Sequence, residues 1–505
     1  MQSVFVDGVG MTKFGKDPRP LTEIFSQAAQ EALAASKEQE VDALYIGVMN
    51  PEEFTGDSNI ASQIADALGL TGIPAIRIET ASSAGAAALQ AAFQAIASGY
   101  YRRVLVLGGE KMTHLSTSAT TRILAEVIDK QERQCGATMP ALAAMIAEKY
   151  RQKFRLSQSR LENMLCSVAL KNHLNGSRNP LAQFQKAITR EAYFASKLVA
   201  TPLRLYDCSP ITDGGAAVVL TGEKTDVRLS GIGQGTGPLS LRERDIFTSF
   251  PATRIAAARA YQMAETSPQS IDFAEIHDAF TPFEIITTED LGFFPPGKGG
   301  DAVIEGKTAF DGPLPINPSG GLKARGHPVG ASGLAQVVEV AKRLRGEGHS
   351  KRHFKRGLTQ STGGLGTNNF VTILERTDSP MTQNPGKPVF PAPVPTSPKK
   401  ATPPGSISDE GEIETFTIVY VTPDGFLPPL ALALIRERNG RLLMAQGEDN
   451  EHLKIGREVY LRRIDDFYLF TVKSHLQKVQ ESLKKLLRHR VAWASKEDKS
   501  SDTKL

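Results

Sequence analysis

A turn of small residues between an apolar segment and an Ala-rich segment is the feature that most constrains the fold of this chain. Residues 75–78 predict a buried strand, and the segment after the turn predicts a buried helix that reaches about Ser98. The first turn of a helix presents free N–H groups and the positive end of the helix dipole, which stabilise negative charge. Because Ser82 lies in this turn, we expect it at an anion-stabilising position.

A second turn of the same kind occurs in the other half of the chain. The sequence SAGAAALQAAFQAI at 83–96 and the sequence GASGLAQVVEVAKRL at 330–344 share a small-residue opening and a similar apolar spacing. Two equivalent halves packed on each other would bring the turns together, and a cleft between halves is a usual place for a ligand. Strands alternate with helices in both halves, which predicts an α/β fold with a largely buried sheet. Residues 110–205 break this pattern and are expected to be an insertion over the sheet.

The composition changes after residue 376 and divides the chain. We expect an N-terminal half at 1–223 and a C-terminal half at 224–376. Residues 377–413 hold nine prolines and predict an extended linker. Residues 414–472 contain five short alternating segments with turn sequences between them, which predict a small β-barrel. Residues 473–505 predict a basic amphipathic helix followed by a disordered tail.

Charge and cysteine usage exclude several classes of function. A net charge of +4 over 505 residues argues against nucleic acid as a partner. No apolar run is long enough for a membrane span, and the N-terminus lacks the features of a signal peptide. The three cysteines, Cys135, Cys166 and Cys208, form no CxxC pair and suit a reducing compartment. We therefore expect a cytoplasmic location.

Several long motifs occur in the order found in one enzyme family. They are DCSPITDGGAAVVL (207–220), EIHDAF (275–280), LGFFPPGKGG (291–300), NPSGGLKARGHPVGASG (317–333) and TGGLG (362–366). On these motifs the first 376 residues resemble the thiolase superfamily, most closely the sterol-carrier-protein-X type and its bacterial and archaeal relatives. The resemblance implies a five-layered αβαβα fold of two similar halves, acting on coenzyme A thioesters. It also implies a homodimer, with further acyl-CoA enzymes as possible partners.

The barrel segment carries a weaker resemblance of its own. Residues 414–472 resemble the OB-fold domain that accompanies such thiolases, often as a separate polypeptide. That domain commonly carries a CxxC zinc ribbon, which this chain lacks, so no metal is expected. The resemblance implies that the barrel lies beside the thiolase entrance of its own or of a neighbouring subunit.

The chain departs from the thiolase pattern at two chemical positions. Ser82 stands where the family has its acylated cysteine, and Gln360 and Ser361 stand where it has a second cysteine or a His-Asn pair. The motif histidines His277 and His327 are present. The resemblance therefore implies Ser82, His277, His327 and Gln360 as catalytic residues.

The resemblance also implies residues that hold the substrate. Backbone N–H groups near Ser82, Thr362 and Gly363 are expected to form an oxyanion hole, since they survive side-chain substitution. Lys323 and Arg325 are candidates to meet a coenzyme A phosphate; the alternative is that they are ordinary charges of a surface loop. His114 and His173 are expected to be structural, and Cys208 to be buried packing.

Serine in place of cysteine changes the chemistry that the site supports. A serine hydroxyl stays protonated at neutral pH and needs a base, for which His327 is the candidate. An acyl-serine is also an ester, less activated toward a carbanion than a thioester. Retro-aldol cleavage needs only a base and an oxyanion site, which His327 and His277 with a water would supply. Some thiolase relatives that pair with OB-fold partners are aldolases.

Three hypotheses remain open at this stage. The first is an acyl-CoA enzyme that works by acyl transfer through Ser82 or by carbon–carbon lyase chemistry. The second is a catalytically degenerate thiolase that binds acyl-CoA as a scaffold for a partner. The third is an interaction protein that acts through its barrel and its basic C-terminal helix.

Overall fold

The computed structural model describes residues 2–347, 352–378, 409–464 and 467–473. Most of the predicted linker lies outside the described residues, and so do the predicted C-terminal helix and tail.

A nine-stranded sheet joins the two halves of the body, in the order β3-β2-β4-β7-β1-β8-β11-β10-β9. Read outward from the central β1–β8 pair, the two sides follow equivalent connections, as the sequence repeat predicts. The strands of the body are β1 Val4–Met11, β2 Ala43–Gly47, β3 Ala75–Ile78, β4 Arg103–Glu110, β7 Gly214–Thr221, β8 Val227–Thr236, β9 Phe273–Ile276, β10 Arg356–Gly363 and β11 Asn368–Arg376.

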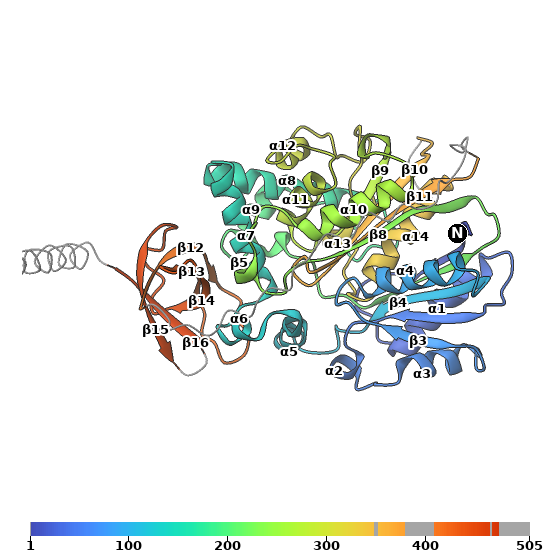
Figure 1. Cartoon of the computed structure of the whole chain (residues 1–505), viewed down its shortest axis with the longest axis horizontal. Coiled ribbons are helices and arrows are strands. Elements are labelled where there is room, and N and C mark those ends of the chain that lie inside the picture. Colours follow the sequence, from blue (N-terminus) through green and yellow to red (C-terminus); the bar gives the residue numbers. More distant parts are fainter. Residues whose placement is uncertain (1, 348–351, 379–408, 465–466, 474–505) are drawn as a thin grey trace, which may run out of the picture.

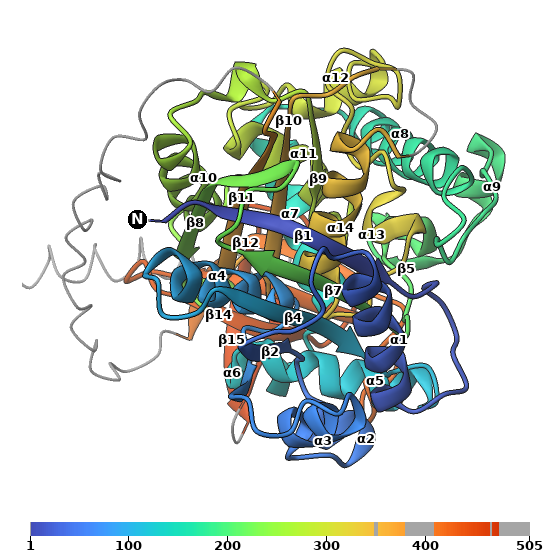
Figure 2. The same cartoon turned by 90° about the vertical axis from the view of Figure 1, so that its right-hand side faces the viewer.

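Helices cover both outer faces of this sheet and fill the space between its halves. Along β4, Val104 and Val106 pack toward α4 and α14, whereas Leu105 and Leu107 pack toward α1. This alternation follows from the two-residue period of a strand. Figures 1 and 2 show α1 and α3 on one side of the body and α10 on the other. The helices of these layers are α1 Leu21–Ala34, α3 Ile60–Ala67, α4 Ala84–Ala97, α10 Pro251–Met263 and α14 Ser332–Leu344. The predicted αβαβα fold is confirmed.

The two central helices approach each other closely where they begin. A Cβ atom on Gly85 would lie 2.5 Å from the carbonyl oxygen of Gly330, and one on Gly333 would lie 2.9 Å from Cβ of Ala86. Only glycine fits at such distances. The small residues that mark both turns in the sequence therefore allow the turns to converge, as predicted.

The predicted insertion forms a helical layer beside the sheet. Its long helices α7 and α8 share a hydrophobic core with α11 from the second half of the chain. The remaining helices and short strands of the body are α2 Pro51–Thr55, α5 Thr117–Leu124, α6 Lys130–Gln134, α7 Met139–Lys153, α8 Gln158–Gly176, α9 Arg190–Ala195, β5 Leu198–Ala200, β6 Leu203–Arg204, α11 Thr281–Asp290, α12 Gly299–Ile304 and α13 Gly321–Ala324.

A five-stranded barrel follows the linker and begins slightly earlier than predicted. Its strands pair in the closed order β12-β13-β14-β16-β15-β12, with β14 and β16 parallel. They are β12 Glu410–Val419, β13 Leu430–Glu437, β14 Leu442–Gly447, β15 Glu458–Ile464 and β16 Phe467–Val472. The barrel is confirmed, and its assignment as an OB-fold stays a prediction.

The barrel packs against the insertion of its own chain (Figure 1). Strand β12 pairs antiparallel with β5 at Val419 and Ala200, and apolar side chains of β13 and β14 belong to the same core as those of α7. Polar contacts flank this core: Thr415 Oγ1 donates to the Met145 carbonyl at 3.1 Å, and Lys149 Nζ lies 2.6 Å from Glu414 Oε1. The barrel and the insertion therefore share one hydrophobic core and pack directly against each other.

Candidate active site

Ser82 occupies the tip of a strained turn between β3 and α4. The strand ends at Ile78 and the helix begins at Ala84, as the sequence predicts. Ala81 has φ 56°, a left-handed conformation that is costly for any residue with a Cβ atom. Ser83, not Ser82, is the N-cap residue, and its hydroxyl donates to the Thr80 carbonyl at 2.7 Å. Because Ser83 occupies the N-cap position, the half-buried Ser82 does not cap the helix.

The end of β10 lies directly against this turn. A Cβ atom on Gly363 would lie 2.0 Å from the Thr80 carbonyl oxygen, so only glycine allows the approach. The neighbouring residue, Thr362, donates its backbone N–H to Nδ1 of His277 at 3.3 Å. The Ser82 turn, β10 and His277 thus form one continuous neighbourhood.

The two motif histidines meet at this point. His277 follows the last residue of β9, and His327 lies in the loop between α13 and α14, where its N–H donates to Thr212 Oγ1 at 2.9 Å. Their ring centroids are 5.1 Å apart and the rings are nearly perpendicular, at 88°. Both rings are buried, with relative exposures of 3% and 8%.

Hydrogen bonds give the two imidazoles opposite roles. The Nδ1 atom of His277 accepts the Thr362 N–H, so a neutral His277 carries its proton on Nε2 and donates from there. His327 Nδ1 lies 2.7 Å from Ser332 Oγ, and that hydroxyl donates its one proton to the Pro328 carbonyl at 2.9 Å. Both contacts are satisfied together when Ser332 accepts from His327 Nδ1, and this assignment leaves His327 Nε2 with a free lone pair. The pair therefore offers one donor and one base.

Burial keeps both histidines neutral at physiological pH. It lowers the pKa of His327 to about 3, with a further contribution from the Arg325 charge. Burial also holds the pKa of His277 well below its usual value, and His327 and Arg325 add to the effect. Neutral rings are what the donor–base arrangement requires.

Hydrogen bonds within the protein hold both polar atoms of the Gln360 side chain. Its Oε1 accepts the backbone N–H of His277 at 3.1 Å, and its Nε2 donates to Thr362 Oγ1 at 2.7 Å and to Asn369 Oδ1 at 3.2 Å. Gln360 therefore lies beside His277, and its catalytic role stays a prediction. The Thr362 N–H likewise serves His277, so the predicted use of Thr362 as an oxyanion donor competes with an existing bond.

Lys323 and Arg325 are buried, so neither is an ordinary surface-loop charge. Lys323 is 1% exposed, and burial lowers its pKa to about 8. Arg325 is fully buried, 3.6 Å from Glu275 and stacked over the ring of Phe14. Their binding of a coenzyme A phosphate stays untested, but it is disfavoured because neither cation faces solvent.

The cysteines offer no replacement for the missing nucleophile. Burial raises the pKa of Cys208 to about 12 and those of Cys135 and Cys166 to about 11. A thiol at such a pKa is not a thiolate at neutral pH. Among the described residues no group of His, Cys, Asp and Glu could hold a metal ion.

Ser332 is the functional residue that the sequence analysis missed. It fixes the tautomer of His327, and it lies five residues further along the same quoted motif, GHPVGAS. Its position in that motif was the available signal. The two histidines of the insertion behave as expected: His114 bonds the Phe54 carbonyl, and His173 is stacked with Phe184.

Comparison with known proteins identifies the family. The thiolase N-terminal domain model matches residues 4–224, and the thiolase C-terminal domain-like model matches residues 233–376. The chain belongs to the thiolase family. This thiolase is 41% identical over 389 residues to an acetyl-CoA acetyltransferase of Methanothermobacter thermautotrophicus, covering 74% of this chain and 100% of the relative.

Two solved structures share the fold of this thiolase. A monomeric SCP2-thiolase like protein type 1 from Mycobacterium smegmatis has a TM-score of 0.73 at 16% identity, covering 93% of this chain and 99% of the other. An Ltp2–ChsH2(DUF35) aldolase has a TM-score of 0.63 at 22% identity, covering 74% and 98%. Within the described part of this thiolase, no helix has the length and apolar character that crossing a membrane requires.

Proposed function

We propose that this thiolase makes or breaks a carbon–carbon bond beside a coenzyme A thioester by aldol-type chemistry, without an acyl-serine intermediate. The observation that supports the proposal is the meeting of two buried imidazoles whose hydrogen-bond partners favour a donor at His277 and a neutral base at His327. A hydrogen-bond donor and a neutral base, held with ring centroids 5.1 Å apart, are the two groups that retro-aldol cleavage needs. The solved structure of the Ltp2–ChsH2(DUF35) aldolase supports the proposal by analogy of fold alone.

The proposed substrate of the cleavage is a β-hydroxyacyl thioester. His327 Nε2 removes the proton of the β-hydroxyl group, the Cα–Cβ bond breaks, and an aldehyde or ketone forms. The electron pair of that bond moves into the thioester, and the His277 Nε2–H stabilises the enolate oxygen. The imidazolium of His327 then returns the proton to Cα, which releases the shortened acyl-CoA.

A second candidate is acyl transfer through Ser82. The strained Ala81 and the beginning of α4 favour it, because both are features of a turn that presents a nucleophile. In the described part of the chain, however, no hydrogen bond links the Ser82 hydroxyl to either imidazole. The catalytically inert scaffold is the third outcome that the experiment below separates.

The test is to incubate the pure protein with a panel of acyl-CoA and β-hydroxyacyl-CoA thioesters and to identify products by mass spectrometry. We expect cleavage of a β-hydroxyacyl thioester that persists in Ser82→Ala and is lost in His327→Ala. An acyl group trapped on Ser82, with activity lost in Ser82→Ala, would replace the proposal by acyl transfer. Binding without turnover would leave the scaffold, and absence of binding would dismiss all three.

We propose that two copies of the chain associate through β3. This strand is the edge of the nine-stranded sheet, and Ile76 on it is 43% exposed. An edge strand with an apolar side chain readily pairs with a second copy. Light scattering during gel filtration tests the dimer, and Ile76→Lys should dissociate it; a monomeric wild-type protein would refute it.

The free cysteines support a cytoplasmic location.

A further inference from the structure

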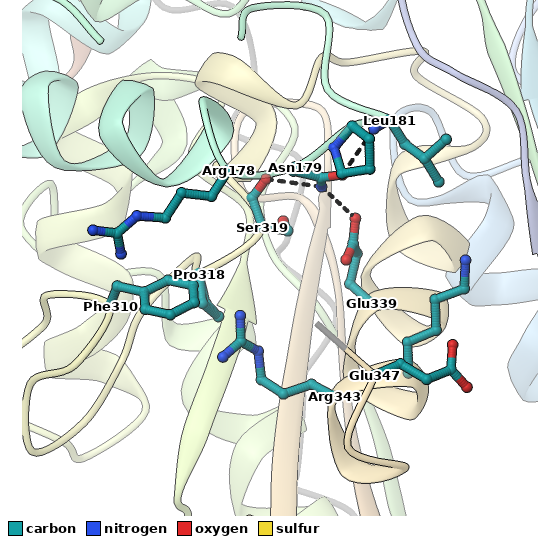
Figure 3. Close-up of a pocket in the computed structure, with 11 residues that line it drawn as sticks. Arg178, Asn179, Leu181, Phe310, Pro318, Ser319, Glu339, Arg343 and Glu347 are labelled. Atoms are coloured by element: carbon teal, nitrogen blue, oxygen red, sulfur yellow. Dashed lines mark hydrogen bonds between the residues drawn. The ribbon is translucent and has the colours of Figure 1, made fainter. Parts of the chain in front are cut away.

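A surface pocket of about 230 Å³ lies at the far end of α14 from His327. Its walls come from the second half of α14, the chain segment after α8, and the loops that carry Phe310 and Ser319. Figure 3 shows the side chains of Arg178 and Arg343 directed toward Phe310. Neither residue belongs to the site described above.

Phe310 holds the two guanidinium groups in place. The Cζ atoms of Arg178 and Arg343 lie 4.6 Å and 4.7 Å from the centroid of its ring. Cation–π contacts of this kind leave the N–H groups at the edge of each guanidinium free for other partners. A planar fork with free N–H groups matches the oxygens of a phosphate or a carboxylate.

One donor of Arg343 is unused by the protein. Within the described ranges, its Nη1 atom is buried and forms no hydrogen bond. Burial lowers the pKa of Arg343, although the carboxylates of Glu275, Glu339 and Asp311 attract its charge. A phosphate oxygen at Nη1 would satisfy this buried donor.

The lining of the pocket carries both signs of charge. Glu339 Oε1 accepts a hydrogen bond from Asn179 Nδ2 at 2.8 Å (Figure 3), and Glu347 is exposed at the rim. Lys342 adds a third cation to the lining.

We propose that this pocket binds a phosphate group, held between Arg178 and Arg343. The group is either inorganic phosphate or the phosphate of a nucleotide, because the two forks recognise the same oxygens in both. Ser319 also lines the pocket, and its Oγ accepts a hydrogen bond from Arg325 Nη1 at 3.2 Å.

The test uses the full-length protein, isothermal titration calorimetry and matched ionic strength. Sodium phosphate and adenosine monophosphate are the probes, and sodium chloride is the blank. We expect saturable binding of at least one probe, weakened at least tenfold in Arg178→Gln and in Arg343→Gln. The control Arg102→Gln removes an exposed arginine elsewhere and should leave the affinity unchanged.

The ratio of the affinities for sodium phosphate and adenosine monophosphate shows whether the pocket prefers inorganic phosphate or a nucleotide phosphate. Binding that is equal in all variants would overturn the proposal, and so would the absence of saturable heat with both probes. Should the arginine variants fail to fold, ³¹P NMR of both probes with the wild-type protein and with Phe310→Leu decides the matter. Line broadening that weakens in Phe310→Leu supports the site, and unchanged or absent broadening refutes it.

Discussion

Removing the hydroxyl of Ser332 should impair catalysis while leaving substrate binding intact. Ser332 is fully buried, and its Oγ is the partner of His327 Nδ1 at 2.7 Å. In Ser332→Ala the Nδ1–H would be a buried donor without an acceptor, which costs about 1–3 kcal/mol. The ring would shift toward the tautomer that carries its proton on Nε2, and that tautomer is not a base toward the substrate.

The rate effect follows from this tautomer cost. A penalty of about 1–3 kcal/mol on the active tautomer corresponds to a loss of about 5- to 150-fold in kcat, with KM little changed. Steady-state kinetics on the substrate found by the thioester panel measure the split. Independently of any substrate, ¹⁵N NMR of labelled histidines reports which nitrogen of His327 carries the proton.

Thr308→Val is the control. The Thr308 hydroxyl is also buried, at 0% relative exposure, and among the described residues it has no hydrogen-bond partner. Removing it should leave the kinetics and the His327 spectrum unchanged. Unchanged kcat and an unchanged His327 spectrum in Ser332→Ala would refute the tautomer argument, as would an equal loss in both variants.

Three further predictions concern stability and folding. The pKa of His327 is about 3 in the folded protein against an ordinary 6.5, so the unfolded state binds the extra proton and stability is lost as the pH falls below 6.5. Between pH 6.5 and pH 5, urea unfolding should show that His327 lowers the free energy of unfolding by about 2 kcal/mol, at ~1.4 kcal/mol per pH unit. The measured quantity is the free energy of unfolding of the wild type minus that of His327→Gln, because this difference removes the opposite effect of the buried carboxyl groups. A difference that does not change with pH would contradict the burial of His327. Gly363→Ala should lower the melting temperature and abolish turnover, because its Cβ would lie 2.0 Å from the Thr80 carbonyl oxygen; wild-type melting and kinetics would show that the turn tolerates the displacement. A chain ending at residue 408 should be insoluble or aggregate in gel filtration, since the core shared with the barrel would be exposed, and a soluble monomer of normal stability would argue against a shared core.

The body of the fold was predictable because its sequence periods are unambiguous. Apolar patterning predicts the strand at 75–78, the helix after the turn and the repeat at 330–344, and the structure contains all three. The five strands of the barrel were predictable from their alternation. The beginning of β12 at Glu410 was missed, because Glu410–Glu412 reads as polar linker until the pairing with β15 is known.

The chemistry of the site was predictable only in part. Motif order placed Ser82 and the two histidines together, but the burial of Lys323 and Arg325 was not visible, since charged residues in a Gly-rich loop are ordinarily exposed. The tautomer of His277 depends on a partner distant in sequence, Thr362. Spacing along the chain carries no information about such partners.

The interior shared by α7, α11 and the barrel has a consequence for how the protein is made. Its apolar residues extend from Ala125 to Met444, so this interior cannot close until most of the polypeptide has left the ribosome. The insertion helices are synthesised early, and their apolar faces stay uncovered while the second half and the proline-rich segment are synthesised. We therefore expect the nascent chain to be prone to aggregation during that interval.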